Sequence, residues 1–169
     1  MRIAICDDDT THLGILENAI QNCVDLRDDE LVIDSYSSGT DLLRAVNDGY
    51  LFTFIFLDIE MPEVTGFDIY SHLSAEDTSI IFVSSHIELL PEAFVLKPYG
   101  FIPKPYTQDV FDRTIKSVLV QRAETQLFSF SSNGVEYRIP CNEILYIAVE
   151  GHYLFIHTIN TKKSCTESR

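Results

Sequence analysis

Residues 54–69 read FIFLDIEMPEVTGFDI, an apolar run that ends at Asp58 and is followed by a polar loop and Gly66. A short apolar run of this kind predicts a strand of a parallel sheet that helices cover. Asp58 would then stand at the carboxyl end of the strand, the edge where open α/β sheets bind their ligands. The stretch therefore indicates a fold class and a candidate reactive carboxylate.

Four more apolar runs repeat the pattern in the first part of the chain, at residues 2–6, 31–36, 79–84 and 100–103. Segments with helical spacing separate them, and this alternation predicts a parallel sheet with helices on both faces. We expect five strands and five helices in about 120 residues, as one doubly wound α/β unit.

Three of the helices have clear start signals and a periodic apolar stripe. Asp9 or Thr10 would cap a first helix, whose apolar positions run from Leu13 to Val24 at steps of three and four. Ser38 precedes a second helix. Thr107 would cap the last one, which presents a buried stripe made of Phe111, Ile115, Val118 and the stem of Arg122.

Polar side chains follow four of the predicted strands: Asp7, Asp8 and Asp9, then Asp58, then Ser84, then Lys104. Carboxylates this close repel one another, by about 4 kcal/mol per pair at 4 Å and an effective dielectric of 20. Mg2+ removes that repulsion and can bridge carboxylates to phosphate oxygens. A lysine and a hydroxyl would bind the other phosphate oxygens, so the set predicts phosphoryl transfer. Lys97 also precedes a proline, but only Lys104 follows the fifth strand.

An alternative interpretation makes Asp7 the nucleophile. Asp7, Asp9 and Thr11 spell D-x-D-x-T after a strand, which resembles the motif of the haloacid-dehalogenase phosphatases. In that pattern the remaining acids follow the lysine, whereas here Asp58 precedes Lys104. The order disfavours a magnesium phosphatase that uses Asp7, which we keep as an alternative.

Four motifs in this order resemble the receiver domain of two-component response regulators, across residues 2–121: IAICDDD, FIFLDIEMPEVTGFDI, IIFVSSH and GFIPKPY. The resemblance implies a flavodoxin-like sheet with the strand order 2-1-3-4-5. It also implies that Asp58 is the phosphoacceptor for a phosphohistidine of a sensor histidine kinase. Such a protein is a regulator rather than a turnover enzyme.

The same resemblance assigns the other site residues. Asp7, Asp8, Asp58 and the backbone carbonyl of Glu60 would hold Mg2+. Lys104 would contact the phosphoryl group, and the Lys104-Pro105 bond would be cis. Ser84 and Phe101 match the switch pair, in which the hydroxyl moves toward the phosphoryl group and the ring turns inward. The activated surface, formed by the fourth helix, fifth strand and fifth helix, could pair two copies.

Beyond residue 126 the apolar pattern changes to period two, which predicts strands. Asn133-Gly134 is a strong hairpin signal. Residues 127–159, through EILYIAVEGHYLFIHT, resemble the start of the LytTR-type DNA-binding domain, in which the position of His152 lies near DNA. That domain is about twice as long, so 127–169 is expected to be a truncated copy with doubtful DNA binding, ending in an unstructured tail from residue 161. We therefore assign 1–121 to the receiver and 122–126 to a linker. A receiver that acts only through protein contacts is the main alternative.

The charge is unevenly distributed along the chain. Residues 1–125 carry 8 Lys and Arg against 22 Asp and Glu, which is the whole net charge of −14, and residues 126–169 carry 4 against 4. No part is the basic patch that nucleic-acid binding usually requires. The four cysteines are far apart and indicate neither a zinc site nor a disulfide framework. With neither a signal peptide nor about 20 consecutive apolar residues, a cytoplasmic protein without a membrane span is expected.

Overall fold

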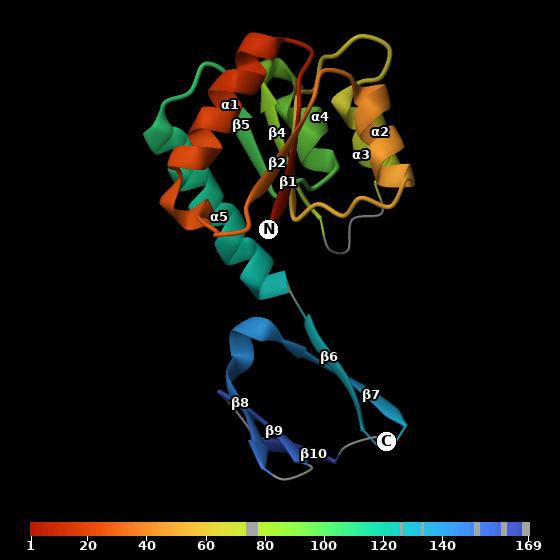
Figure 1. Cartoon of the computed structure of the whole chain (residues 1–169), viewed down its shortest axis with the longest axis vertical. Coiled ribbons are helices and arrows are strands. Elements are labelled where there is room, and N and C mark those ends of the chain that lie inside the picture. The colour runs from red at the N-terminus through yellow and green to blue at the C-terminus, as the bar shows by residue number, and fades with distance from the viewer. Residues whose placement is uncertain (74–77, 126, 133, 151–152, 160–161, 167–169) are drawn as a thin grey trace. The chain divides into compact units, whose positions relative to one another are not determined.

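Five parallel strands form the sheet at the centre of the first part of the chain (Figure 1). They are β1 (Arg2–Cys6), β2 (Val32–Tyr36), β3 (Phe54–Leu57), β4 (Ser79–Ser84) and β5 (Gly100–Pro103). Their order, β2-β1-β3-β4-β5, confirms the doubly wound, flavodoxin-like sheet. Because the order reverses at β1, the carboxyl ends of β1 and β3 meet at the point where such sheets bind ligands.

The computed structural model describes residues 1–73, 78–125, 127–132, 134–150, 153–159 and 162–166. The chain divides into two compact units, Met1–Val118 and Leu119–Arg169, which we call the first and the second unit. No helix in the described ranges is long and apolar enough to cross a bilayer.

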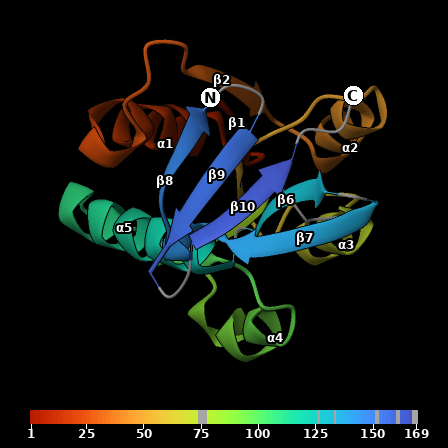
Figure 2. The same cartoon turned by 90° about the horizontal axis from the view of Figure 1, so that it is seen from below.

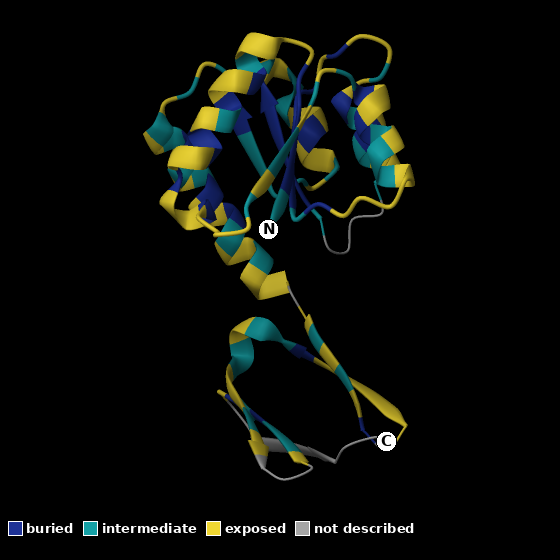
Figure 3. Cartoon of the chain, viewed as in Figure 1, coloured by how far each residue is buried: buried dark blue, intermediate teal, exposed yellow. Residues whose placement is uncertain are grey.

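In the described ranges, five α-helices cover the sheet: α1 (Thr10–Asn22), α2 (Gly39–Asn47), α3 (Gly66–His72), α4 (Leu90–Val95) and α5 (Gln108–Thr125). Figures 1 and 2 show α1 and α5 on one face and the other three on the opposite face. Figure 3 shows buried residues along the central strands and, beside exposed ones, on each of these helices. Phe111, Ile115 and Val118 of α5 are fully buried, which confirms the predicted stripe.

The start of α1 matches the prediction, but its end does not. Asp9 is the N-cap, and its side chain accepts a hydrogen bond from the Thr11 N–H. The helix ends at Asn22, and the chain then forms a short 3-10 turn from Val24 to Leu26. Val24 is 67% exposed, so its assignment to the buried stripe was wrong. Leu26 takes the buried place instead, because the turn changes the direction of the side chains.

In the second unit, the described residues beyond α5 form two small antiparallel sheets. One is the hairpin of β6 (Leu127–Ser132) and β7 (Val135–Pro140), and the other contains β8 (Ile144–Glu150), β9 (Tyr153–Thr158) and β10 (Lys162–Thr166). The hairpin confirms the turn signal at its described residue Gly134, whose φ is +75°. Figure 3 shows mostly exposed and half-buried strands here, with Ile139 and Ile156 as the buried apolar residues among those described.

Two expectations for this part of the chain need revision. Residues 162–166 were expected in an unstructured tail but form β10, which pairs with β9. Hydrogen bonds between backbone groups form this pairing, so the side chains of residues 162–166 need not alternate between apolar and polar, and the sequence pattern did not indicate a strand. Residues 122–125, assigned to the linker, form the last turn of α5.

Candidate functional site

Backbone hydrogen bonds just beyond the strand ends bring the predicted site residues together. The Asp58 N–H donates to the Cys6 carbonyl at 2.9 Å, and the Lys104 N–H donates to the Ser84 carbonyl at 2.8 Å. The Asp7 N–H donates to the Tyr36 carbonyl at 3.1 Å. Each strand pairing therefore continues one residue past the sheet, so that the side chains of Asp7, Asp58 and Lys104 converge.

Three carboxylates form the anionic half of the site. Asp7 is 2% exposed and Asp58 9%, whereas Asp8 lies at the surface. One oxygen from each lies within 4.8 Å of the others. Such a set of hard oxygen ligands suits a small divalent cation such as Mg2+. Asp9 does not join them, since its carboxylate caps α1.

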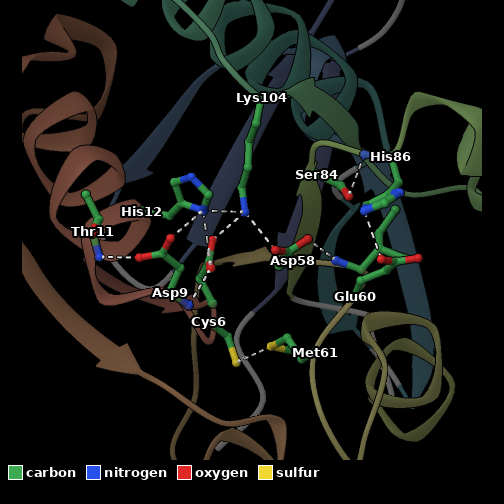
Figure 4. A network of polar contacts seen from close by, with 12 residues as sticks. Cys6, Asp9, Thr11, His12, Asp58, Glu60, Met61, Ser84, His86 and Lys104 are labelled. Carbon is green, nitrogen blue, oxygen red and sulfur yellow. Dashed lines mark hydrogen bonds and ion pairs between the residues drawn. The ribbon is translucent and has the colours of Figure 1, made fainter.

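Lys104 bridges the two buried carboxylates (Figure 4). Its Nζ lies 2.6 Å from Asp7 Oδ2 and 2.7 Å from Asp58 Oδ2, and its side chain is 7% exposed. Burial acts to lower the pKa of Lys104, but the hydrogen bonds to Asp58 and Asp7 outweigh it and the pKa is raised. The Lys104 ammonium therefore lies between the two buried carboxyl groups, and both contacts favour its charged form. The Lys104-Pro105 bond is cis, as expected.

The loop that follows Asp58 is held by short hydrogen bonds. The Ile59 N–H donates to Asp58 Oδ1 at 2.7 Å, and the Gly66 N–H donates to the Ile59 carbonyl at 2.8 Å. A Cβ at Gly66 would overlap the Asp58 carbonyl oxygen and lie 2.9 Å from the Ile59 Cα. Only glycine fits there, which accounts for the close approach of α3 to the acceptor.

The predicted switch residues occupy different surroundings. Ser84 is fully buried, and its hydroxyl accepts a hydrogen bond from the His86 N–H at 3.2 Å. Phe101 is half-buried against the core and lines a surface hollow between α4 and α5, together with Phe94 and Val110.

Two histidines next to the site were not predicted to take part. His86 pairs with Glu60 through Nε2 and with Glu88 through Nδ1, both at 2.8 Å. The hydrogen bond to Glu88 and the charge of Glu60 raise the pKa of His86. His12 lies on α1 with Nδ1 3.3 Å from Lys104 Nζ. His12 follows Asp8 by four residues at the start of a helix. This spacing was the one feature of the sequence that could have indicated that His12 lies near the site.

Cys6 is close to the carboxylates, but its thiol is buried in the core. Its sulfur lies 3.6 Å from the sulfur of Met61 inside the core. Burial, together with the charge of Asp7, raises the pKa of Cys6 to about 12. A thiol that stays protonated at neutral pH is neither a nucleophile nor a good metal ligand. The proposed DNA contact His152 lies outside the described residues.

Comparison with known proteins places this arrangement in a family. The family model of the response regulator receiver domain matches residues 3–116, and the chain belongs to this family. Receiver domains are signalling domains, phosphorylated by sensor histidine kinases, rather than turnover enzymes. The match supports the receiver interpretation over the phosphatase that would use Asp7.

Individual relatives agree with this assignment. The transcriptional regulatory protein NatR of Bacillus subtilis is 26% identical over 129 residues, which are 75% of this chain and 53% of NatR. The response regulator protein TodT of Pseudomonas putida is 30% identical over 69% of this chain and 50% of TodT. The response regulatory domain of mrkE from Klebsiella pneumoniae superposes with a TM-score of 0.62 at 24% identity, over 72% of this chain and 97% of that domain. The chain spans about half the length of the curated relatives.

Proposed function

We propose that this chain is a response regulator of a two-component system in which a sensor histidine kinase phosphorylates Asp58 in a Mg2+-dependent reaction. The observation that carries the proposal is the Asp58 carboxylate itself. It is nearly buried at the end of β3, it contacts the Lys104 ammonium, and it lies beside Asp7 and Asp8. A carboxylate held between a lysine and a cation site is prepared to receive a phosphoryl group.

The donor set fits Mg2+. Asp7, Asp8, Asp58 and the backbone carbonyl of Glu60 would hold it, because oxygen ligands and more than one carboxylate are what this cation prefers. When bound, Mg2+ neutralises charge on phosphate oxygens. The close carboxylates would otherwise repel one another, and Lys104 alone offsets only part of that repulsion.

The chain's own side chains would carry the transfer. A carboxylate oxygen of Asp58 forms the new bond to phosphorus, the bond from phosphorus to the phosphohistidine nitrogen breaks, and that nitrogen keeps the electron pair. Lys104 balances the charge on a phosphoryl oxygen. The hydroxyl of Ser84 turns from the His86 N–H to donate a hydrogen bond to another oxygen, and Phe101 moves inward behind it.

The response would reach transcription through the second unit. Its antiparallel strands, including the β6–β7 hairpin, are consistent with a LytTR-like output domain, and the relative NatR is a transcriptional regulator. The face of α4, β5 and α5 would pair two activated copies, since Phe94 of α4 and Ile87 of the turn just before α4 are exposed there beside Phe101. His152 stays a proposed DNA contact.

One observation favours a second candidate, a receiver that acts through protein contacts alone. Leu145 and Val149 of β8 are 64% and 71% exposed, and residues 126–169 carry no net charge. Apolar strands without a basic surface suit a protein partner better than DNA.

Acetyl phosphate labelling tests the phosphorylation proposal. Wild type, Asp58→Asn and Asp7→Asn are incubated with Mg2+ and acetyl phosphate, and the acyl phosphate is mapped by mass spectrometry. We expect label on Asp58 in wild type, none in Asp58→Asn, and much slower labelling in Asp7→Asn because the cation site is damaged. Label on Asp7, or label that persists in Asp58→Asn, would disprove the receiver mechanism.

A gel shift with increasing salt separates the two output modes. A LytTR-like reader gives a specific complex whose affinity falls steeply with salt, because each phosphate contact releases counterions. A receiver that acts through protein contacts gives no specific complex at any salt concentration.

A further inference from the structure

His12 contacts the Lys104 ammonium on the side away from Asp58 (Figure 4). Its Nδ1 is 3.3 Å from Lys104 Nζ, while the two carboxylate contacts of that Nζ are 2.6 and 2.7 Å. The same Nδ1 also faces Asp7 Oδ1 at 3.7 Å and Asp9 Oδ2 at 3.8 Å, which are beyond hydrogen-bond distance. An ammonium group has three N–H donors and accepts nothing. Asp7 and Asp58 accept hydrogen bonds from two of these donors. The third N–H can donate a hydrogen bond to His12 only if Nδ1 carries a lone pair. A hydrogen bond from Lys104 to this nitrogen therefore places the ring proton on Nε2.

The helix fixes where this ring lies. Asp9 caps α1 through the Thr11 N–H at 2.7 Å, and Leu13 and Leu16 anchor the same helix in the core. A cavity of about 220 Å³ borders His12, Leu16, Lys104 and Tyr106. The ring therefore borders open space on that side, and the polar groups near its Nδ1 are Lys104, Asp7 and Asp9.

We propose that His12 is a positioning residue for phosphorylation: it accepts the third hydrogen bond of Lys104 and holds that ammonium beside Asp58. The inference rests on the proposed function of Asp58. It adds a residue of α1 to a site otherwise built from the carboxyl ends of β1, β3, β4 and β5.

The neutral character of this acceptor matters for the reaction. Once Asp58 carries a phosphoryl group, its carboxylate charge is lost and Lys104 must turn toward the new oxygens. A third carboxylate in the place of His12 would compete for the ammonium by charge. The lone pair of a neutral imidazole fixes the position of Lys104 Nζ without neutralising it. The positive charge of the ammonium therefore stays available to the phosphoryl group.

The first experiment measures the tautomer and does not depend on phosphorylation. Nitrogen-15 NMR of the histidine-labelled full chain is recorded at pH 8, above the ordinary histidine pKa of about 6.5. We expect the Nδ1 of His12 to be unprotonated and the proton to be on Nε2. A proton on Nδ1 would overturn the proposal, because that nitrogen could then not accept from Lys104.

The second experiment measures phosphorylation of the full chain by acetyl phosphate with saturating Mg2+. His12→Ala and His12→Leu should lower the limiting rate constant about tenfold, as expected when one hydrogen bond to a charged group is lost. The donor concentration at half-maximal rate and the Mg2+ affinity, measured by calorimetry, should stay close to wild type. His12→Asn, which restores an acceptor near the Nδ1 position, should recover most of the rate. His72→Ala is the matched control, since His72 is exposed on α3 and its ring contacts Ser71 and the Asp68 carbonyl.

The outcomes separate this proposal from the proposed function. If wild type gains no label on Asp58, the proposed function fails and the role of His12 fails with it. If wild type is labelled and His12→Ala reacts at the same rate, only the role of His12 is overturned. A loss of rate in His12→Ala that His12→Asn does not restore, with Mg2+ affinity falling in parallel, would show general damage to the site and would also overturn it.

Discussion

At Gly66 a hydrogen atom occupies the place where any other residue would have a side chain. A Cβ there would overlap the Asp58 carbonyl oxygen, so the backbone of the acceptor would have to move. We predict that Gly66→Ala lowers the free energy of unfolding by about 1–3 kcal/mol, the usual range for overpacking, and slows labelling of Asp58. Urea unfolding and acetyl phosphate kinetics measure the two effects.

Gly14 is the matched control for that substitution. It lies on α1, and a Cβ added there would have no atom of the described residues within 4 Å beyond its own helix. Gly14→Ala should therefore stabilise the protein by about 0.5–1 kcal/mol and leave labelling unchanged. Equal effects of the two substitutions would contradict the assigned role of Gly66.

Asp8 offers a way to test the cation site without disturbing the core, because its side chain is exposed. Mg2+ should stabilise wild type by about 1.4 kcal/mol at ten times its dissociation constant, since binding favours the folded state. In Asp8→Ala this gain should largely vanish. Without Mg2+ the variant should be at least as stable as wild type, because one repulsive carboxylate is gone. Thermal unfolding with Mg2+ and with a chelator checks both expectations.

At the scale of elements, α3 depends on a reciprocal cap at its start. The Thr65 hydroxyl donates to Asp68 Oδ2 at 2.6 Å, the Thr65 N–H donates to the same oxygen, and the Asp68 N–H donates to the Thr65 hydroxyl. These hydrogen bonds favour the ionised carboxylate and lower the pKa of Asp68. The cap therefore stabilises the fold above the ordinary aspartate pKa and loses that effect as the pH falls through the lowered value.

This sign gives a pH-dependent prediction. Asp68→Ala should unfold at a lower urea concentration than wild type at pH 7. The difference between the two midpoints should shrink as the pH is lowered from about 4, the ordinary aspartate pKa, to the lowered value. Urea titrations of wild type and Asp68→Ala at pH 7 and near pH 3 measure this change. If the difference between the two midpoints is the same at both pH values, the proposed role of the Asp68 carboxylate in the cap is wrong.

For the whole molecule, the burial of apolar residues differs between the two units. The first unit has a continuous core on both faces of its sheet, whereas Ile139 and Ile156 are the buried apolar residues described in the second. We predict that residues 1–125 alone unfold within about 4 °C of the corresponding transition in the full chain. Residues 119–169 alone should show no cooperative transition, because a piece of this size buries too little surface. Circular dichroism on heating measures both.

Much of the first unit could be predicted from local patterns. Alternating apolar runs and helical stripes indicated the sheet and its two helical layers, because burial on both faces leaves a signal in nearby residues. The carboxylates and Lys104 could be predicted because the carboxyl ends of parallel strands share one edge. The end of α1 at Asn22 and the pairing of β10 could not, since backbone geometry rather than side-chain pattern determines them.

The amino-acid sequence by itself therefore determined the fold class, the family and the acidic residues of the site. Only the tertiary structure decided which groups contact them. His12 and Lys104 are 92 residues apart in the sequence, and they meet because α1 covers the sheet in which β5 is a strand. Gly66 is required because α3 starts against the backbone of Asp58. The physical reason is the same in each case. Such contacts depend on distances between elements, which packing determines and no local pattern of residues records.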